Sequence, residues 1–487
     1  MKSTRPMKKS IPIFLAIAFV LGGTLWPQRA LSHDTLTTTV LFDREIVRIL
    51  NSHCVMCHDV NGPAFPLDTY EQTFLLRREI RFDVIGRHMA PWAAVSGYGS
   101  FVNDNSLTLR EIQFFVSWAE GWGPRNSGVA YTDVAQGSAQ LKPVAAHIDF
   151  NRWALGEPTR TLEISSNAIE PHQAEETKRT VVDLGLTSER WLTAVEYKPS
   201  DHRAVHAAFF SIQETGQWIG SWTPWYGFVN LQKGLAYRLP AGSHLAAEIH
   251  YGPAKESVVE HGSLGLFFAD RPSAREVSDV VLDSKGEIPA NAHSQKVEAG
   301  TKLTADTNIL ALWPEIHPGM KSVEVFGQKP DGETQVLLFA KDFPLDWPTP
   351  YIFKEPITLP KGTELSVAAY YANAGPASQP VALHLTVSGY QGTALPPDKP
   401  VPEKAQKSSP QRYKLDGTVQ TVNAKDSKLV VQHSAIPGFM PAMTMQYDAG
   451  KQEDLKNISA GDRIQADLVV VDAEMHLENI KVVSHAK

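Results

Sequence analysis

The chain has 487 residues, more than a single hydrophobic core usually serves, so we expect several domains. Hydrophobic residues make up 43% of the sequence and charged residues 20%, which is typical of a folded globular protein. The formal net charge of −7 supplies no broad basic surface, and the composition therefore argues against nucleic acid as a partner.

Residues 1–32 have the pattern of a secretory signal peptide. Lys8 and Lys9 precede an apolar run over residues 11–25, and the stretch RALSHD that follows supplies small residues for a peptidase site. We predict cleavage after Ser32, and therefore an exported protein. The alternative is an uncleaved membrane anchor, although the apolar run is shorter than the roughly 20 residues that span a bilayer. No later segment is apolar enough to span one.

Export gives meaning to the cysteine count. Exported proteins commonly contain disulfides, yet this chain has only two cysteines, Cys54 and Cys57, which lie three residues apart. We therefore expect the pair to serve another purpose. Cleavage after Ser32 would also leave His33 at the amino end, where its amine and ring can chelate copper. The alternative is that His33 only happens to follow the peptidase site.

Residues 41–121 are expected to form a small α-helical domain. The stretches FDREIVRILNSH and LTLREIQFFVSWAEGW space their apolar residues by three and four positions, as an amphipathic helix does. Ser106 or Thr108 is expected to cap the second helix, with Glu111 in its first turn.

The two cysteines and the next histidine form the pattern C-x-x-C-H, with Cys54, Cys57 and His58. Two thiols at this spacing on one helical turn add to the vinyl groups of haem, and the histidine ligates the iron. A thioredoxin-like thiol pair is the rival interpretation, but it expects a βαβ setting. A zinc site would need two more ligands nearby. The motif thus predicts a covalently attached haem c.

A sixth ligand for the iron is expected downstream. Met89 lies in a proline-bearing loop of the kind that presents a thioether to iron, and His88 is the competing candidate. The stretch from Asp43 to Gly121 resembles the class I c-type cytochromes, especially the modules that open larger periplasmic redox enzymes. The resemblance implies Met89 as the distal ligand. Because histidine and methionine together close the iron to exogenous ligands, such a haem would transfer electrons.

Residues 144–392 are expected to be all-β. Short strand candidates such as RTVVDLGL, AVHAAFFSI and TELSVAAYYAN alternate with turn residues, a pattern that favours β-sandwiches. The length suits two sandwiches, over residues 144–272 and 285–392, with a division near residues 271–284.

Four stretches of this region resemble the copper type II, ascorbate-dependent monooxygenases, the family of the peptidylglycine and dopamine hydroxylases. They are RWLTAVEYKPSDHRAVHAAFFSI, GLAYRLPAGSHLAAEIHYGPA, ALWPEIHPGMKSVEVFGQKPDGE and ITLPKGTELSVAAYYANAG. The resemblance implies two jelly-roll-like sandwiches that face each other across a cleft. It also implies an electron-relay copper with three histidines on the first, and an oxygen-activating copper with two histidines and a methionine on the second.

The chain matches these ligand sets only in part. His206 matches one histidine of a His-His pair, but its neighbour is Ala207, and His250 matches the third histidine. On the second sandwich Glu315 replaces the first histidine of the motif and only His317 remains. The position of the methionine ligand, far downstream, holds no methionine.

Three interpretations of these residues stay open. His206, His250 and His244 could form a relay-type copper site, and Glu315 with His317 could hold a harder metal. The third interpretation is that all are polar residues of a scaffold kept for packing. Because a catalytic copper needs about three protein ligands and an open position, the incomplete sets argue against ordinary ascorbate-type hydroxylation.

Residues 393–411 contain five prolines among Lys and Ser residues and almost no apolar side chains, which predicts a stiff, solvated linker. Residues 412–484 follow as a compact unit of strand-like pieces such as YKLDGTVQTVNA and AGDRIQADLVVV. We predict a small β-barrel for this unit.

Met440, Met443 and Met445 fall within six residues of this last unit. Thioethers select Cu(I), and side chains at i and i+2 of a strand share a face, so Met443 and Met445 can point at one ion. His433 could complete the site from the preceding strand. The alternative is that the methionines fill the core.

The unit resembles the small periplasmic copper and silver efflux metallochaperones, a five-stranded barrel whose motif has a His followed by Pro-Ala-Met-Thr-Met. His433, Met443 and Met445 match that motif, whereas Met440 stands where many members place a tryptophan over the metal. The resemblance implies copper binding by these residues.

Two functional hypotheses follow. The first is a periplasmic redox protein that transfers electrons between haem c and copper on a monooxygenase-like scaffold, with a redox partner protein or small electron donor. A copper-dependent oxidoreductase with altered sites is a variant of it. The alternative is a copper-binding, trafficking or resistance protein on a pseudoenzyme scaffold, in which the haem sets the redox state of copper. Neither hypothesis includes nucleic acid or a stable membrane span after signal cleavage.

Overall fold

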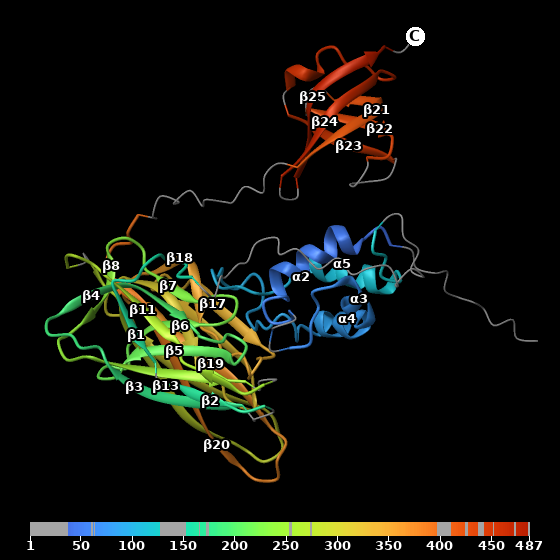
Figure 1. Ribbon diagram of the computed structural model, residues 1–487. Coiled ribbons are helices and arrows are strands. Elements are labelled where there is room, and N and C mark those ends of the chain that lie inside the picture. The colour runs from blue at the N-terminus through green and yellow to red at the C-terminus, as the bar shows by residue number, and fades with distance from the viewer. Residues whose placement is uncertain are drawn as a thin grey trace, which may run out of the picture.

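A computed structural model describes residues 38–59, 62, 64–126, 152–164, 166–171, 175–252, 256–272, 275–396, 411–423, 427–436, 443–450, 452–471 and 474–485. The predicted signal peptide, His33, Met440 and most of the predicted linker lie outside these residues. In the part of the chain that is described, no helix is both long and apolar enough to cross a membrane. Strands predominate, and the α-helices gather in one unit near the amino end (Figure 1).

Residues 38–126 contain the helices, which pack around a cluster of buried apolar side chains that includes Phe42, Leu50 and Trp118. The helical elements are the π-helical turn η1 (Phe42–Ile46), α2 (Val47–His53), α3 (Tyr70–Leu75), α4 (Arg77–Gly86) and α5 (Leu109–Glu120). We call these residues the helical unit. Its assignment as a cytochrome c domain stays a prediction.

The cap of α5 is Thr108. Its hydroxyl accepts a hydrogen bond from the Glu111 N–H at 3.2 Å, and the Glu111 carboxylate accepts one from the Thr108 N–H at 2.7 Å. This reciprocal pair satisfies two backbone donors that have no partner within the helix. Of the two cap candidates in the sequence, Ser106 and Thr108, the structure uses Thr108.

A segment between α4 and α5, residues 92–103, leaves the helical unit and joins the β region; we call it the strap. Its backbone bonds to neighbouring strands, with Val95 N donating to Phe339 O and Val102 N to Ile352 O, both at 2.8 Å. The side chain of Phe101 lies in the same buried cluster as those strands. The strap thus fixes the loop that carries Met89 to the β region.

The first half of the β region pairs two main sheets around one apolar core, which includes Leu192, Phe210 and Ile249. The six-stranded sheet contains β1 (Arg160–Glu163), β11 (Ser263–Phe268), β4 (Arg190–Lys198), β8 (Leu235–Leu239), β12 (Arg275–Glu276) and β7 (Phe228–Asn230). The four-stranded sheet has the order β3 (Glu176–Asp183), β9 (His244–Tyr251), β5 (Val205–Ile212) and β6 (Trp218–Trp222). A short ribbon joins β2 (Asn167–Ile169) and β10 (Val258–Glu260).

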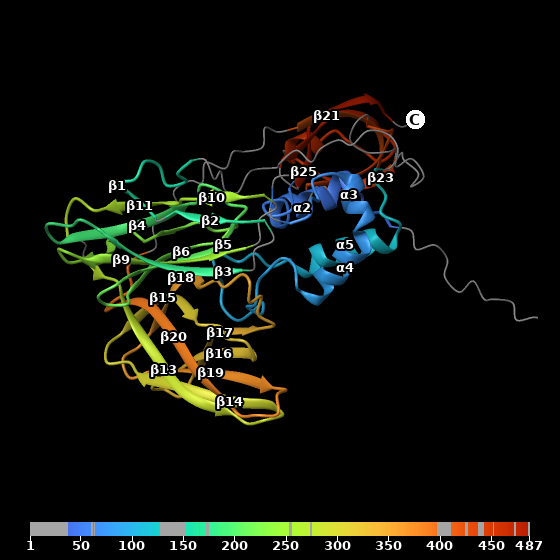
Figure 2. The same ribbon diagram turned by 60° about the horizontal axis from the view of Figure 1, so that its bottom comes forward.

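The second half pairs two four-stranded sheets around a separate core. One has the order β13 (Ser278–Ile288), β20 (Gln379–Gln391), β15 (Thr307–Pro314) and β18 (Tyr351–Leu359). The other has the order β14 (Ala292–Lys302), β19 (Glu364–Asn373), β16 (Met320–Gln328) and β17 (Thr334–Lys341). Figure 2 shows the four main sheets as successive layers. Phe209 of β5 stacks on Trp313 of β15, with ring centroids 4.7 Å apart, where the halves meet.

The C-terminal unit is a closed five-stranded barrel, as predicted. Its strands follow the order β21 (Gln411–Asn423), β22 (Lys428–His433), β23 (Met443–Ala449), β25 (Glu474–Ser484) and β24 (Arg463–Val471), with the 3-10 turn η2 (Gln452–Leu455) between β23 and β24. The chain is therefore multidomain and mostly β. The residue boundaries predicted for its domains stay predictions.

Candidate functional site

A cavity of about 230 Å³ lies at the helical unit, and all four residues predicted to hold haem line it. Cys54, Cys57 and His58 come from the turn after α2, and Met89 comes from the loop after α4. These residues are separated by α3 and α4 in sequence, so the fold of the helical unit brings them together.

His58 is held in one orientation. Its Nδ1 lies 2.9 Å from the carbonyl oxygen of Phe65, which can only accept a hydrogen bond, so the ring proton sits on Nδ1 and the lone pair on Nε2. A metal-ligating histidine typically has such a second partner. Gly62 is required beside it, because a Cβ there would lie 2.2 Å from the Cys57 carbonyl oxygen.

The two cysteines are half-buried. Burial raises the pKa of both Cys54 and Cys57 to about 12, with the neighbouring Cys57 thiol adding to the shift at Cys54 and Asp59 adding to that at Cys57. A thiol pair that exchanges disulfides needs the opposite shift, since the thiolate is the reactive form. The setting, at the end of a helix rather than in a βαβ unit, also differs from the thioredoxin-like alternative.

Met89 and His88 face different surroundings. Met89 lines the cavity, whereas His88 does not; the His88 side chain is 60% exposed, and its Nδ1 lies 3.5 Å from an Asp83 carboxylate oxygen. A third histidine, His53, lines the cavity, but its ring nitrogens contact the Asn105 carbonyl at 3.2 Å and the Glu111 carboxylate at 3.4 Å. Of the two sequence candidates for the distal ligand, the geometry favours Met89.

These residues fit a covalently held haem. The donor set is two thiols, an oriented imidazole and a thioether, and the walls include the apolar side chains of Ile80, Val84 and Leu107. Such a haem would supply one-electron chemistry, while the chain's own residues would hold and orient it and exclude water.

Three residues of the β region complete the cavity lining: His206 of β5, Trp225 between β6 and β7, and Trp347 between β17 and β18. The His206 ring stacks on the Trp347 ring, with centroids 4.1 Å apart and planes 25° from parallel. The Trp225 indole N–H donates to the carbonyl oxygen of Asn103, in the strap, at 3.1 Å. The two tryptophans were not predicted, since neither belongs to a recognisable motif.

The surroundings of His206 are those of a buried neutral imidazole. Burial lowers its pKa to about 4, the charge of Asp346 opposes this shift, and the charge of His250 adds to it. Its Nε2 side faces Gly252, because a Cβ at Gly252 would lie 1.9 Å from that atom. Its Nδ1 lies 3.9 Å from a Glu175 carboxylate oxygen.

The other histidines predicted for the first sheet pair are engaged elsewhere. His250 contacts the Glu248 carboxylate through Nε2 at 2.9 Å and the Thr177 hydroxyl through Nδ1 at 3.3 Å. His244 contacts Glu214 at 2.7 Å and starts β9, whereas His250 lies six residues further along, about 20 Å away in an extended strand. His244 and His250 therefore do not share a site.

Glu315 and His317 are neighbours, with 4.0 Å between the His317 Nε2 and a Glu315 carboxylate oxygen. Within the part of the chain that the structure describes, this buried Nε2 has no hydrogen-bond partner. Among the described residues, no group of three or more His, Cys, Asp or Glu side chains is arranged to hold a metal ion. For the β region, the geometry therefore favours the scaffold interpretation over a complete copper centre.

In the barrel, His433 has the features of a metal ligand. It is only 2% exposed, and its Nδ1–H donates to the carbonyl oxygen of Ser434 at 2.7 Å. Its Nε2 is buried and has no hydrogen-bond partner among the described residues, and its ring packs edge-on against Tyr447, with centroids 5.9 Å apart. A buried nitrogen without a partner costs free energy that a bound metal would recover.

The strand register places the predicted ligands close to each other. His433 of β22 lies directly opposite Met443 of β23, and Met445 lies two residues further along. The Met445 side chain is partly buried against the barrel core. Met440 and the side chain of Met443 lie outside the described residues. His433 and Met445 thus come from neighbouring strands, as the sequence motif predicted.

The comparisons with known proteins bear on this unit. Residues 412–482 match the family described as copper binding periplasmic protein CusF. They therefore form a CusF-like copper-binding domain, and copper ions are a ligand of this chain. The comparison with curated proteins found no match.

Among solved structures, apo-CusF residues 6–88 from Escherichia coli is 24% identical, with coverage of 18% of this chain and 99% of that chain and a TM-score of 0.15. CusF-Ag(I) residues 10–88 from Escherichia coli is 26% identical, with coverage of 15% and 95% and a TM-score of 0.15. The major capsid protein P2 of bacteriophage PM2 is 7% identical, with coverage of 47% and 98% and a TM-score of 0.24. Scores this low carry no argument.

Proposed function

We propose that this is a periplasmic copper-handling protein that binds Cu(I) in its C-terminal barrel and delivers or sequesters it. His433, Met443 and Met445 are the proposed ligands, with Met440 as a further thioether. The observation that carries the proposal is the buried Nε2 of His433, which has no partner among the described residues, within the segment that matches a copper-binding family. Imidazole and thioether donors together select a soft ion such as Cu(I).

The test is a competition titration of the purified full-length protein with a chromophoric Cu(I) chelator. The wild type should take up Cu(I) at the barrel, and His433→Ala or Met445→Leu should weaken this binding by roughly tenfold or more, because one of few ligands is lost. His476→Ala is the matched control, since this half-buried barrel histidine contacts Glu478 at 3.2 Å. Equal binding by His433→Ala and His476→Ala would refute the proposal.

A second part of the function rests on the cavity of the helical unit. We propose that Cys54 and Cys57 attach haem c, that His58 and Met89 are its axial ligands, and that the haem exchanges electrons with a redox partner and so sets the redox state of copper. The convergence of these four residues on one cavity favours this hypothesis. The raised pKa of both thiols favours it over a thiol-exchange function.

Expression of the full chain with a haem-attachment system tests this second part. We expect a coloured protein whose haem resists extraction by acidified organic solvent. Cys54→Ala with Cys57→Ala should abolish the covalent attachment, and Met89→Ala should alter the visible spectrum by removing an axial ligand, whereas His88→Ala should not. A colourless wild type would exclude the haem without affecting the Cu(I) titration.

The β region is proposed to act as a scaffold that joins the two units. Its candidate metal residues are spread over separate contacts: His206 on Trp347, His250 on Glu248 and Thr177, and His317 beside Glu315. Metal analysis of the full-length protein checks this. One copper, lost on changing His433 and Met445 together, is the expected result, whereas a second copper, lost on changing His250 or His317, would indicate an oxidoreductase.

A further inference from the structure

The wall between the haem cavity and the β region is made by two stacked rings. Trp347 lies in the loop from β17 to β18, and His206 is the second residue of β5, so the two come from different halves of the β region. Their stacking, with centroids 4.1 Å apart, is the closest ring contact between residues of the cavity lining among the described aromatic pairs. Trp225 lies beside Trp347, with centroids 6.2 Å apart.

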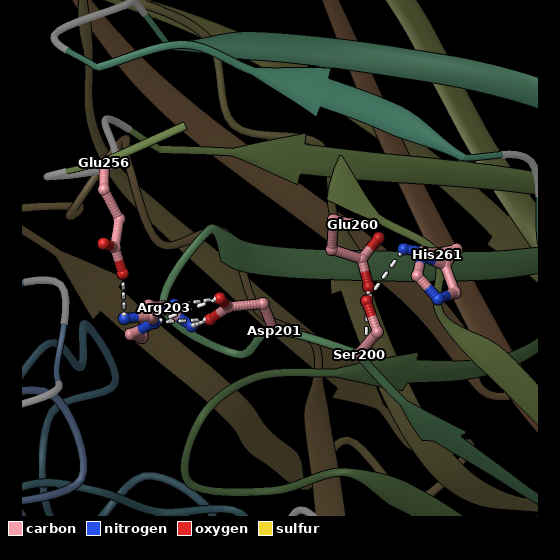
Figure 3. Close-up of polar contacts among 6 residues, drawn as sticks. All are labelled: Ser200, Asp201, Arg203, Glu256, Glu260 and His261. Carbon is pink, nitrogen blue, oxygen red and sulfur yellow. Dashed lines mark hydrogen bonds and ion pairs between the residues drawn. The ribbon is translucent and has the colours of Figure 1, made fainter. Parts of the chain in front are cut away.

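The loop that leads into β5 is tightly braced, which fixes the position of His206. The Ser200 N–H donates to Glu260 at 2.9 Å, the Ser200 hydroxyl accepts from the His261 N–H at 2.9 Å, and Arg203 bridges Asp201 and Glu256 (Figure 3). Glu260 itself is fully buried. A loop held by so many contacts loses little further freedom when it positions a side chain.

The same loop also faces the predicted haem attachment turn. Burial lowers the pKa of His202, and the nearby carboxylate of Asp59, the residue after His58, opposes this shift. The strap in turn anchors the Met89 loop to β17 and β18. The cavity is therefore a composite of the helical unit and both halves of the β region.

We propose that Trp347, held in place by His206, is the positioning residue with which the β region closes the haem cavity to water and thereby raises the reduction potential of the haem. This inference rests on the proposed haem function. Ferric haem carries more positive charge than ferrous haem, and water stabilises the more charged form, so a cavity from which water is excluded favours the reduced state.

His206 serves this purpose through its ring face. Its Nε2 edge is occupied by Gly252, where only the absence of a Cβ leaves room for the ring. The contact with Trp347 is a stack rather than a metal bond or a hydrogen bond to the indole. This distinguishes the proposal from a copper-ligand role for His206.

The experiment uses the full-length holoprotein and two readouts: the midpoint potential from a spectroelectrochemical titration, and the rate at which ferricyanide oxidises the reduced haem. Trp347→Ala should lower the potential and accelerate oxidation several-fold, and Trp347→Phe should lie between it and the wild type. Trp153→Ala is the matched control, because Trp153 packs near Lys198, at 4.7 Å, and does not line the cavity.

Two variants of the support provide an independent test. Gly252→Ala, which places a Cβ 1.9 Å from His206 Nε2, should shift both readouts in the direction of Trp347→Ala, and so should His206→Ala, which removes the stacked ring. If the haem is attached and Trp347→Ala behaves like Trp153→Ala in both readouts, the proposal is wrong while the haem function stands. If no haem is attached to the wild type, both fall together.

Discussion

The strap offers the sharpest test of how the helical unit is joined to the β region. Phe101 lies in the strap yet is only 3% exposed, and its ring packs against Phe353 and Tyr351 at centroid distances of 5.0 and 5.4 Å. Its backbone also bridges to Phe353. Phe101→Ala would leave a cavity within the core of the second sheet pair.

Replacing a fully buried phenylalanine by alanine costs about 3–5 kcal/mol, through lost transfer free energy and the cavity left behind. Where hydrogen exchange is limited by opening of this core, a stability loss of at least 3 kcal/mol makes exchange in the variant about 100-fold faster, or more, than in the wild type. Hydrogen–deuterium exchange with mass spectrometry should show this acceleration in peptides from β16 to β18. Peptides from the barrel should be unchanged, because its core cluster shares no residue with this one.

Val102→Ala is the matched control. Val102 is the next residue along the strap, but it is 43% exposed, so the loss of its side chain should change stability by less than about 0.5 kcal/mol. If Phe101→Ala accelerates exchange no more than Val102→Ala does, then the strap is not part of this core, and the Met89 loop is not anchored by it.

Three further substitutions test individual contacts. Burial raises the pKa of Glu111, but hydrogen bonds from His53 and Thr108 outweigh this effect and hold the pKa at about 2, below the ordinary 4.5. The carboxylate therefore stabilises the fold above pH 4.5, and this stabilisation is lost as the pH falls toward 2. In urea unfolding, the free energy of unfolding of Glu111→Gln should be about 1–2 kcal/mol below that of the wild type at pH 6, and this difference should disappear toward pH 2. A difference that stays constant with pH would contradict this. Asn103→Ala removes a 2.7 Å hydrogen bond to Pro350 O and a 3.1 Å hydrogen bond from Ile352 N, so thermal unfolding should show a free energy of unfolding lower by about 1–3 kcal/mol. An unchanged free energy of unfolding would argue against the strap contacts. Gly262→Ala would place a Cβ 2.1 Å from the buried Tyr197 hydroxyl. Thermal melts followed by circular dichroism should show a destabilisation of about 1–3 kcal/mol, and an unchanged melting temperature would contradict this.

The parts of the site that could be predicted are those whose residues are close in sequence. Cys54, Cys57 and His58 belong to one turn after a helix, so their spacing alone indicates what they can hold. Met443 and Met445 are likewise two residues apart in a strand, and the barrel predicted around them was confirmed. The copper-binding character of this unit was also confirmed.

The parts that could not be predicted depend on side chains from distant elements. His206 and His250 lie on adjacent strands, and sequence patterns grouped them as ligands of one metal, but the described contacts of their rings lead to different neighbours. Which face a ring presents depends on strand register and on the space around it, here provided by Gly252. Trp347 carried no sequence signal, because a lone tryptophan in a loop is compatible with many environments.

The sequence by itself determined the local chemistry: which donors lie within one turn or one strand, where a helix is capped by Thr108, and which segments are helical or β. These properties depend on covalent spacing and local propensity, which act over a few residues. Only the tertiary structure decided that the strap enters the core of the second sheet pair and that Trp347 and His206 line the cavity near Cys54. Such contacts join residues far apart in the chain, and they form only where packing of whole sheets and helices brings their surfaces together.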